Sequence, residues 1–143
     1  MSDPFDLQRF IDAQQGVYET ALGELRAASK QSHWMWFIFP QLRGLGRSPT
    51  AEYFGIASAE EAAAYLGHPL LGPRLQQCVG AILPWAGERS AEQIFGAVDA
   101  MKLRSSLTLF YAVSCAGPFA QALDGFFDGG RDERTLALLP VQQ

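Results

Sequence analysis

Apolar residues recur three and four positions apart along most of this chain, which is the spacing of one face of an α-helix. The longest such segment covers residues 4–28, where Asp3 and Pro4 have the order of an N-cap and a first helical residue. No segment alternates apolar and polar residues next to a hairpin turn, so no strand is expected. We therefore predict an all-α protein, a single compact domain over residues 1–143 with six to eight mostly short helices.

Capping residues mark where the other helices begin. Ser48 followed by Pro49 predicts one start, and the segments 58–61 and 90–93 have the Ser-x-x-Glu/Gln spacing of a capping box. His68 before Pro69 is expected to end a helix rather than to take part in chemistry. The expected helices cover residues 4–28, 48–56, 58–66, 70–85, a short segment after 90, a longer one after Asp99, then 118–128 and 132–139.

The composition is that of a globular protein, because 48% of the residues are hydrophobic and 18% are charged. A net charge of −4 disfavours a broadly basic nucleic-acid-binding surface. Cys78 and Cys115 stand outside any C-x-x-C motif, which indicates buried thiols in a reducing compartment. His33 and His68 have no acidic residue at ligand spacing, so neither a metal site nor a cofactor is predicted.

The N-terminal residues are acidic and contain no apolar signal-peptide core. The longest strongly apolar run, residues 34–39, is far shorter than the roughly 20 residues of a membrane span. We expect a cytoplasmic protein of bacterial type without a membrane segment.

Residues 34–39 are six large apolar residues in succession, and they include the aromatic rings of Trp34, Trp36 and Phe37. Such a run cannot turn every side chain to one side of a helix or a strand, so part of it must face a second partner. Two interpretations stay open at this point. The run is either a fully buried central segment or the wall of a pocket on whose rings a ligand stacks.

Four basic residues and no acidic residue lie between Glu24 and Glu52, in a chain whose net charge is negative. This surplus, with a glycine-containing turn that leads into the helix at Ser48, indicates a site for phosphate or carboxylate. The alternative is that the cations only solvate the surface. The four residues are Arg26, Lys30, Arg43 and Arg47.

Glu52 is the first acidic residue after this basic stretch, one turn into the helix that begins at Ser48. It either complements the helix dipole or acts as a general acid or base beside the aromatic run. A second polar group follows Asp99, where Lys102 and Ser105 share one helical face and Arg104 lies on a neighbouring face. These side chains either line a polar pocket or remain on the surface, with Asp99 as a cap that pairs with Lys102 or Arg104.

Three long motifs carry a resemblance to a known family: residues 32–42 (SHWMWFIFPQL), 68–75 (HPLLGPRL) and 102–110 (KLRSSLTLF). They resemble the bacterial family catalogued as domain of unknown function 1810, and shorter matches extend the resemblance over nearly the whole chain. The resemblance implies an all-α domain, which agrees with the helical periodicity, and it implies no settled activity.

A more distant resemblance involves residues 39–40 (FP), 50–54 (TAEYF), 61–62 (EA), 66–67 (LG) and 102–103 (KL). Their order is similar to the NADAR superfamily, whose members are all-α and act on ADP-ribose or related N-glycosides. This resemblance implies that Glu52 is a catalytic glutamate that assists the attack of water on an oxocarbenium-like sugar centre. Tyr53 and Ala59 stand where that superfamily has a histidine and a lysine.

Three functions are therefore considered. The favoured one is the binding or hydrolysis of an anionic nucleotide-like small molecule such as ADP-ribose, with Glu52 as the catalytic residue. The second is a protein-interaction module that exposes part of residues 34–39, and the third is nucleic-acid binding through the basic stretch, which the net charge disfavours. The expected ligand-binding residues are Trp34, Trp36, Phe37, Arg43, Arg47, Tyr53, Lys102, Arg104 and Ser105.

Overall fold

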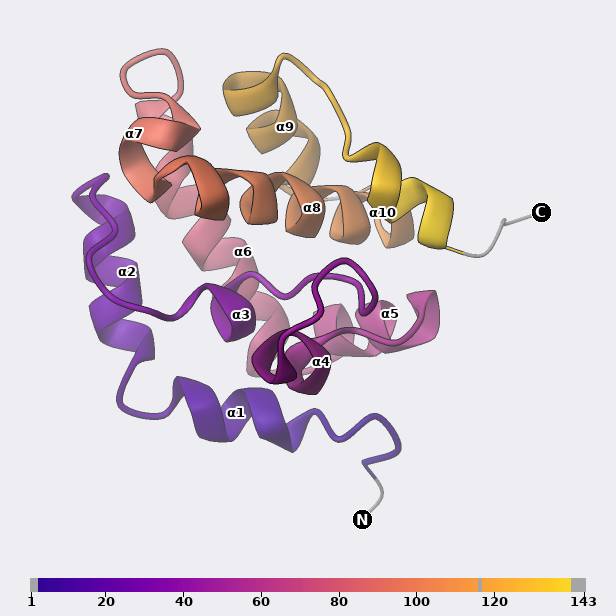
Figure 1. The fold of residues 1–143 in the computed structure, drawn as a ribbon. Coiled ribbons are helices and arrows are strands. Elements are labelled where there is room, and N and C mark those ends of the chain that lie inside the picture. The colour runs from indigo at the N-terminus through magenta and orange to yellow at the C-terminus, as the bar shows by residue number, and fades with distance from the viewer. Residues whose placement is uncertain (1–2, 116, 140–143) are drawn as a thin grey trace.

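The computed structural model describes residues 3–115 and 117–139, which form α-helices joined by short loops (Figure 1). Within these residues there are ten α-helices, six of them at least seven residues long, and no strand. The all-α prediction is confirmed. The elements are α1 (Gln8–Gln14), α2 (Tyr18–Arg26), α3 (Met35–Ile38), α4 (Pro49–Phe54), α5 (Ala59–Gly67), α6 (Leu71–Ile82), the 3-10 turn η1 (Leu83–Trp85), α7 (Ala91–Phe95), α8 (Ala97–Val113), α9 (Phe119–Phe127) and α10 (Glu133–Leu138).

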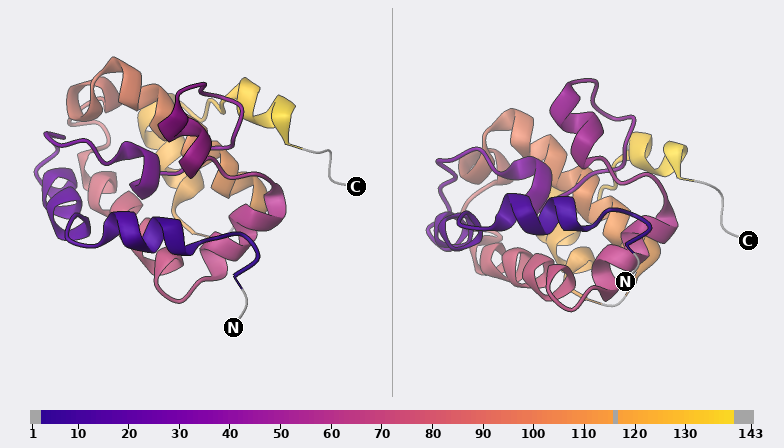
Figure 2. Two further views of the ribbon diagram at one scale, coloured as in Figure 1. Left: turned by 60° about the horizontal axis from the view of Figure 1, so that its bottom comes forward. Right: turned by 90° about the horizontal axis from the view of Figure 1, so that it is seen from below.

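The longest helix, α8, packs against four of the other helices. It lies against α5, α7, α9 and α10, while α6 lies against α2, α5 and α9. Leu103, Leu107 and Phe110 lie at helical spacing on one face of α8, and all three are buried. Figures 1 and 2 show α2 and α10 on opposite sides of the molecule.

The single helix expected over residues 4–28 is wrong, because the structure divides it into α1 and α2. Gly16 lies between them with φ +77°, in the left-handed region that glycine adopts without a steric penalty. The break lets α1 pack on α3 while α2 packs on α6. Asp3 also lies further from the helix than expected, since α1 begins at Gln8 and the Asp3 carboxylate accepts hydrogen bonds from the backbone N of Leu7 and Gln8.

Several predicted helix boundaries are confirmed. The Ser48 and Asp132 side chains each accept a hydrogen bond from the backbone amide three residues further on, at the starts of α4 and α10. Ser90 and Gln93 form a complete capping box at α7, and His68 ends α5. Capping residues predict these helix starts correctly because each capping side chain and the backbone amide that it satisfies lie within one helical turn.

The capping box expected at Ser58 is only half formed. The Ser58 side chain accepts from the backbone N of Glu61, but the Glu61 carboxylate accepts from the backbone N of Ala57 at 2.9 Å instead of from Ser58. The other carboxylate oxygen of Glu61 lies 2.7 Å from a guanidinium nitrogen of Arg9. A contact with the N-terminal region therefore changes the direction of this side chain.

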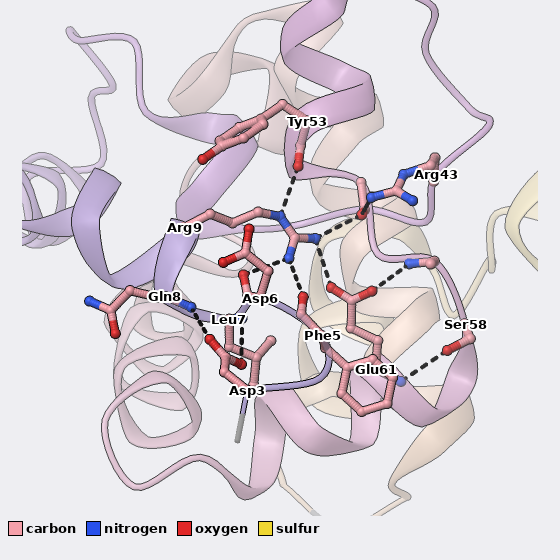
Figure 3. A network of polar contacts seen from close by, with 12 residues as sticks. Asp3, Phe5, Asp6, Leu7, Gln8, Arg9, Arg43, Tyr53, Ser58 and Glu61 are labelled. Atoms are coloured by element: carbon pink, nitrogen blue, oxygen red, sulfur yellow. Dashed lines mark hydrogen bonds and ion pairs between the residues drawn. The ribbon is translucent and has the colours of Figure 1, made fainter. Parts of the chain in front are cut away.

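Arg9 is the centre of a buried polar network (Figure 3). Besides its ion pair with Glu61, its guanidinium donates to four backbone carbonyl oxygens and lies over the ring of Phe10. The network ties the N-terminal segment to the last turn of α4 and to Gly55, which follows that helix. The four carbonyl groups belong to Phe5, Asp6, Tyr53 and Gly55.

The two cysteines differ in their surroundings. Cys78 is buried on α6, and burial raises the pKa of its thiol to about 12. Cys115 is exposed after the end of α8, so the expectation of two buried thiols is wrong for this residue. In the described part of the chain, none of the helices combines the length and the apolar character needed to cross a bilayer.

Candidate ligand-binding pocket

The aromatic run 34–39 belongs mostly to the core. Trp34 is 0% exposed and packs against Phe39 and Phe95, while Trp36 and Phe37 are half-buried. None of residues 34–39 is exposed, so the run does not present the exposed aromatic patch on which the alternative of a protein-interaction module was based. The buried-segment interpretation holds for most of the run, and Trp36 is the residue that also reaches a pocket.

Glu24 fixes the loop that leads into this run. Its carboxylate accepts hydrogen bonds from Trp34 Nε1 at 2.8 Å, from Ser32 Oγ, and from the backbone N of Gln31 and Ser32. Burial by itself would raise the pKa of Glu24, but these hydrogen bonds outweigh it and lower the pKa to about 2. The carboxylate is thus ionised at neutral pH and holds Trp34 in the core.

A pocket of about 220 Å³ lies between the loop after α3, the first half of α8 and the start of α10. Its wall combines apolar side chains, an indole ring, three cations and one carboxylate. The lining residues are Trp36, Gln41, Leu45, Gly46, Val98, Met101, Lys102, Arg104, Ser105, Asp132 and Arg134.

Lys102 holds its ammonium group over the Trp36 ring, with Nζ 4.0 Å from the ring centroid. The same Nζ lies 3.3 Å from Oδ1 of Asp99, one helical turn earlier on α8. Oδ2 of Asp99 in turn lies 2.8 Å from Nζ of Lys30. The pairing of Asp99 with Lys102 is confirmed, but Gly96 rather than Asp99 occupies the N-cap of α8.

Two cations of the basic stretch have polar partners that the local sequence does not indicate. Lys30 is paired with Asp99, which lies far away in the chain. Arg43 donates to the backbone oxygens of Glu52 and Gly55, at 3.1 and 3.0 Å. The expectation that all four cations are unopposed is wrong for Lys30, because the sequence shows only the charges of neighbouring residues.

The other side of the pocket is built where α8 meets α10. Arg104 donates to the backbone oxygens of Gly130 and Arg131, so its guanidinium supports the turn before α10. Ser105 Oγ donates to Oδ2 of Asp132, the N-cap residue of α10, at 3.1 Å. Arg134 donates to the backbone oxygen of Leu45 at 3.1 Å and so joins α10 to the loop after α3.

Backbone pairing holds that loop in place. The backbone N of Arg43 donates to Ile56 O at 2.7 Å, and the backbone N of Ile56 donates to Gln41 O at 2.8 Å. Gly46 fits because a Cβ at this position would lie 2.9 Å from the Ala51 Cβ, closer than side chains normally approach. The loop thereby brings Gln41 and Gly46 to the pocket wall.

The structure brings together four of the predicted site residues and separates the rest. Trp36, Lys102, Arg104 and Ser105 line the pocket. The other predicted residues lie outside this lining. Trp34 is core, Phe37 packs against Phe54, and four residues are exposed on α4 or on the loop before it: Arg43, Arg47, Glu52 and Tyr53.

Several lining residues were not predicted. Val98 and Met101 precede Lys102 and Ser105 at the spacing of one helical face, so the periodicity of α8 contained a signal for them. Asp132 and Arg134 come from the start of α10, and nothing in the local sequence connects them to α8. In the part of the chain that the structure describes, no group of three or more His, Cys, Asp or Glu side chains is arranged to hold a metal ion.

Comparisons with known proteins agree with the fold and leave the activity open. No curated protein matches the chain. A solved structure, the conserved hypothetical protein Rv1873 from Mycobacterium tuberculosis, is 54% identical in sequence and superposes with a TM-score of 0.94, over 98% of this chain and 100% of that one. The family model described as a protein of unknown function, DUF1810, matches residues 4–139. The chain therefore belongs to the DUF1810 family.

Proposed function

We propose that this protein binds a small anionic molecule in the pocket between α3, α8 and α10. The observation that carries the proposal is the convergence of Lys102, Arg104 and Arg134 with the Trp36 ring on one pocket. Three cations face one carboxylate there, that of Asp132, in a chain whose net charge is −4. A positive pocket in a negative protein attracts an anion and concentrates it at that place.

The cations have different parts in this proposal. Arg104 already donates to two carbonyl groups of the turn before α10, so we assign it mainly to the shape of the pocket. Lys102 stands over an indole, and a ligand anion at its ammonium group would accept a charge-assisted hydrogen bond. Gln41, Ser105 and Asp132 add hydrogen-bonding groups of the kind that hold hydroxyl groups.

The size of the pocket limits the ligand. Its 220 Å³ lies below the ~300–1,000 Å³ of sites for drug-sized ligands. A sugar phosphate fits this volume better than a complete dinucleotide-like molecule does. ADP-ribose would place one end inside and extend over Val98 and Met101, which are 68% and 69% exposed at the rim.

A hydrolytic form of the proposal comes from the resemblance to the NADAR superfamily. It requires Glu52 to activate water at an N-glycosidic bond. Glu52 is exposed on α4 and outside the described pocket lining, so we restrict the main proposal to binding. Replacing Glu52 by Gln tests the hydrolytic form separately.

The test is a thermal-shift titration with ribose 5-phosphate, ADP-ribose, NAD and inorganic phosphate. A ligand at 100 times its Kd stabilises the folded state by about 2.7 kcal/mol, which raises the Tm by several degrees in a domain of this size. Lys102→Met should remove the shift, whereas Arg26→Met, which deletes an exposed cation on α2, should keep it. No shift of the wild-type protein with any of these compounds, or an equal shift in Lys102→Met, would overturn the proposal.

A further inference from the structure

Lys30 is a cation that lies outside the described pocket lining and is nevertheless connected to the pocket. Its side chain is 7% exposed, and its Nζ donates to the backbone oxygen of Ser32 at 2.6 Å. The same Nζ lies 4.9 Å from the centroid of the Trp34 ring and 2.8 Å from Oδ2 of Asp99. These contacts fix the position of the ammonium group, and Lys30 is not one of the residues that line the pocket.

Asp99 is shared between two lysines. Oδ2 faces Lys30 and Oδ1 faces Lys102, and the Asp99 and Lys102 side chains are 20% and 22% exposed. Burial by itself would raise the pKa of Asp99, but the two ammonium groups outweigh it and lower the pKa. At neutral pH one negative charge therefore lies between two positive charges, which leaves a surplus of one positive charge.

We infer that Lys30 makes the pocket select an anion, because it neutralises Asp99 and so leaves the charge of Lys102 available to the ligand. This inference rests on the proposed function. Without Lys30, the Asp99 carboxylate would have Lys102 as its ion-pair partner, and the pair would carry no net charge. Lys30 is in this sense a positioning residue, acting on the ligand only through Asp99 and Lys102.

A purely structural role is the competing explanation, since Lys30 also holds the loop before Trp34. The two explanations differ in what a second substitution does. If charge is the reason, Asp99→Asn should compensate for Lys30→Met, because the remaining Lys102 again carries one unpaired positive charge. If the loop contact is the reason, removing Asp99 restores nothing.

The experiment is a calorimetric titration of each variant with ribose 5-phosphate, after its fold has been checked by circular dichroism. Lys30→Met should weaken binding about tenfold, a change of about 1.4 kcal/mol. The double variant Lys30→Met/Asp99→Asn should bind within about threefold of wild type, while Lys30→Arg, which keeps the charge, should bind nearly as wild type does. Asp99→Asn alone should bind at least as tightly as wild type, and this variant decides the matter if Lys30→Met does not fold.

The outcomes separate this inference from the proposed function. Binding that Lys102→Met removes and Lys30→Met leaves unchanged overturns the inference and supports the pocket. Weakened binding in the double variant or in Asp99→Asn also overturns it. Absence of binding by the wild-type protein overturns both.

Discussion

The Arg9 network allows a stability prediction with an internal control. The side chains of Arg9 and Glu61 are 5% and 3% exposed, so both charges are removed from water and depend on each other. Arg9→Met leaves the Glu61 carboxylate without its ion-pair partner and four carbonyl groups without the guanidinium donor. Breaking a buried ion pair on one side costs about 3–5 kcal/mol. We expect a loss of this size in the free energy of unfolding.

Arg43 provides the matched control, because its guanidinium donates to the same carbonyl oxygen, Gly55 O, at the same distance of 3.0 Å (Figure 3). Arg43 is exposed, and a contact of this kind at the surface contributes less than about 1 kcal/mol. Arg43→Met should therefore shift the urea midpoint only slightly. The measurement is urea denaturation followed by circular dichroism at neutral pH.

Two results would refute this reasoning. One is a loss in Arg9→Met that lies within about 1 kcal/mol of the loss in Arg43→Met. The other concerns the double variant Arg9→Met/Glu61→Met, in which no charge is left unpaired at this place. Its loss should be smaller than the sum of the two single losses, and strict additivity would show that the two side chains are not coupled.

The two glycines of α6 should respond in opposite ways to alanine. A Cβ at Gly72 would lie 2.0 Å from the Leu66 backbone oxygen, so Gly72→Ala should cost about 1–3 kcal/mol, while Gly80→Ala, with open space around it, should gain about 0.5–1 kcal/mol from helix propensity. Urea denaturation measures both, and losses of equal size would contradict the prediction. The second prediction concerns acid: Glu24 has a pKa of about 2 in the folded protein against 4.5 ordinarily, so its contribution to stability is complete above pH 4.5 and disappears as the pH falls toward 2. Glu24→Gln should lower the Tm at neutral pH and flatten its decline on the acid side, and an unchanged pH profile would show that this carboxylate is not responsible.

Helix class and helix starts follow from interactions within one turn. Ser48 and Ser90 cap their helices as expected, because each satisfies an amide three residues further on, and Asp132 does the same at the start of the helix expected over residues 132–139. The predictions fail where a distant group competes or a single residue changes the backbone. The Glu61 side chain pairs with Arg9 instead of completing the capping box at Ser58. Gly16 ends one helix and separates it from the next, although the apolar spacing continues through it.

The features of the pocket likewise fall into two groups: those that local interactions determine and those that depend on contacts between distant segments. Helical periodicity was sufficient to predict the all-α architecture and the polar side of α8 that carries Lys102, Arg104 and Ser105. Packing of the whole chain was needed to bring Trp36 onto Lys102, to place α10 across the pocket and to pair Lys30 with Asp99. The physical reason is range: helical spacing and capping act between residues a few positions apart, whereas the pocket and its ion pairs join segments that are far apart in the chain and meet only when the core packs.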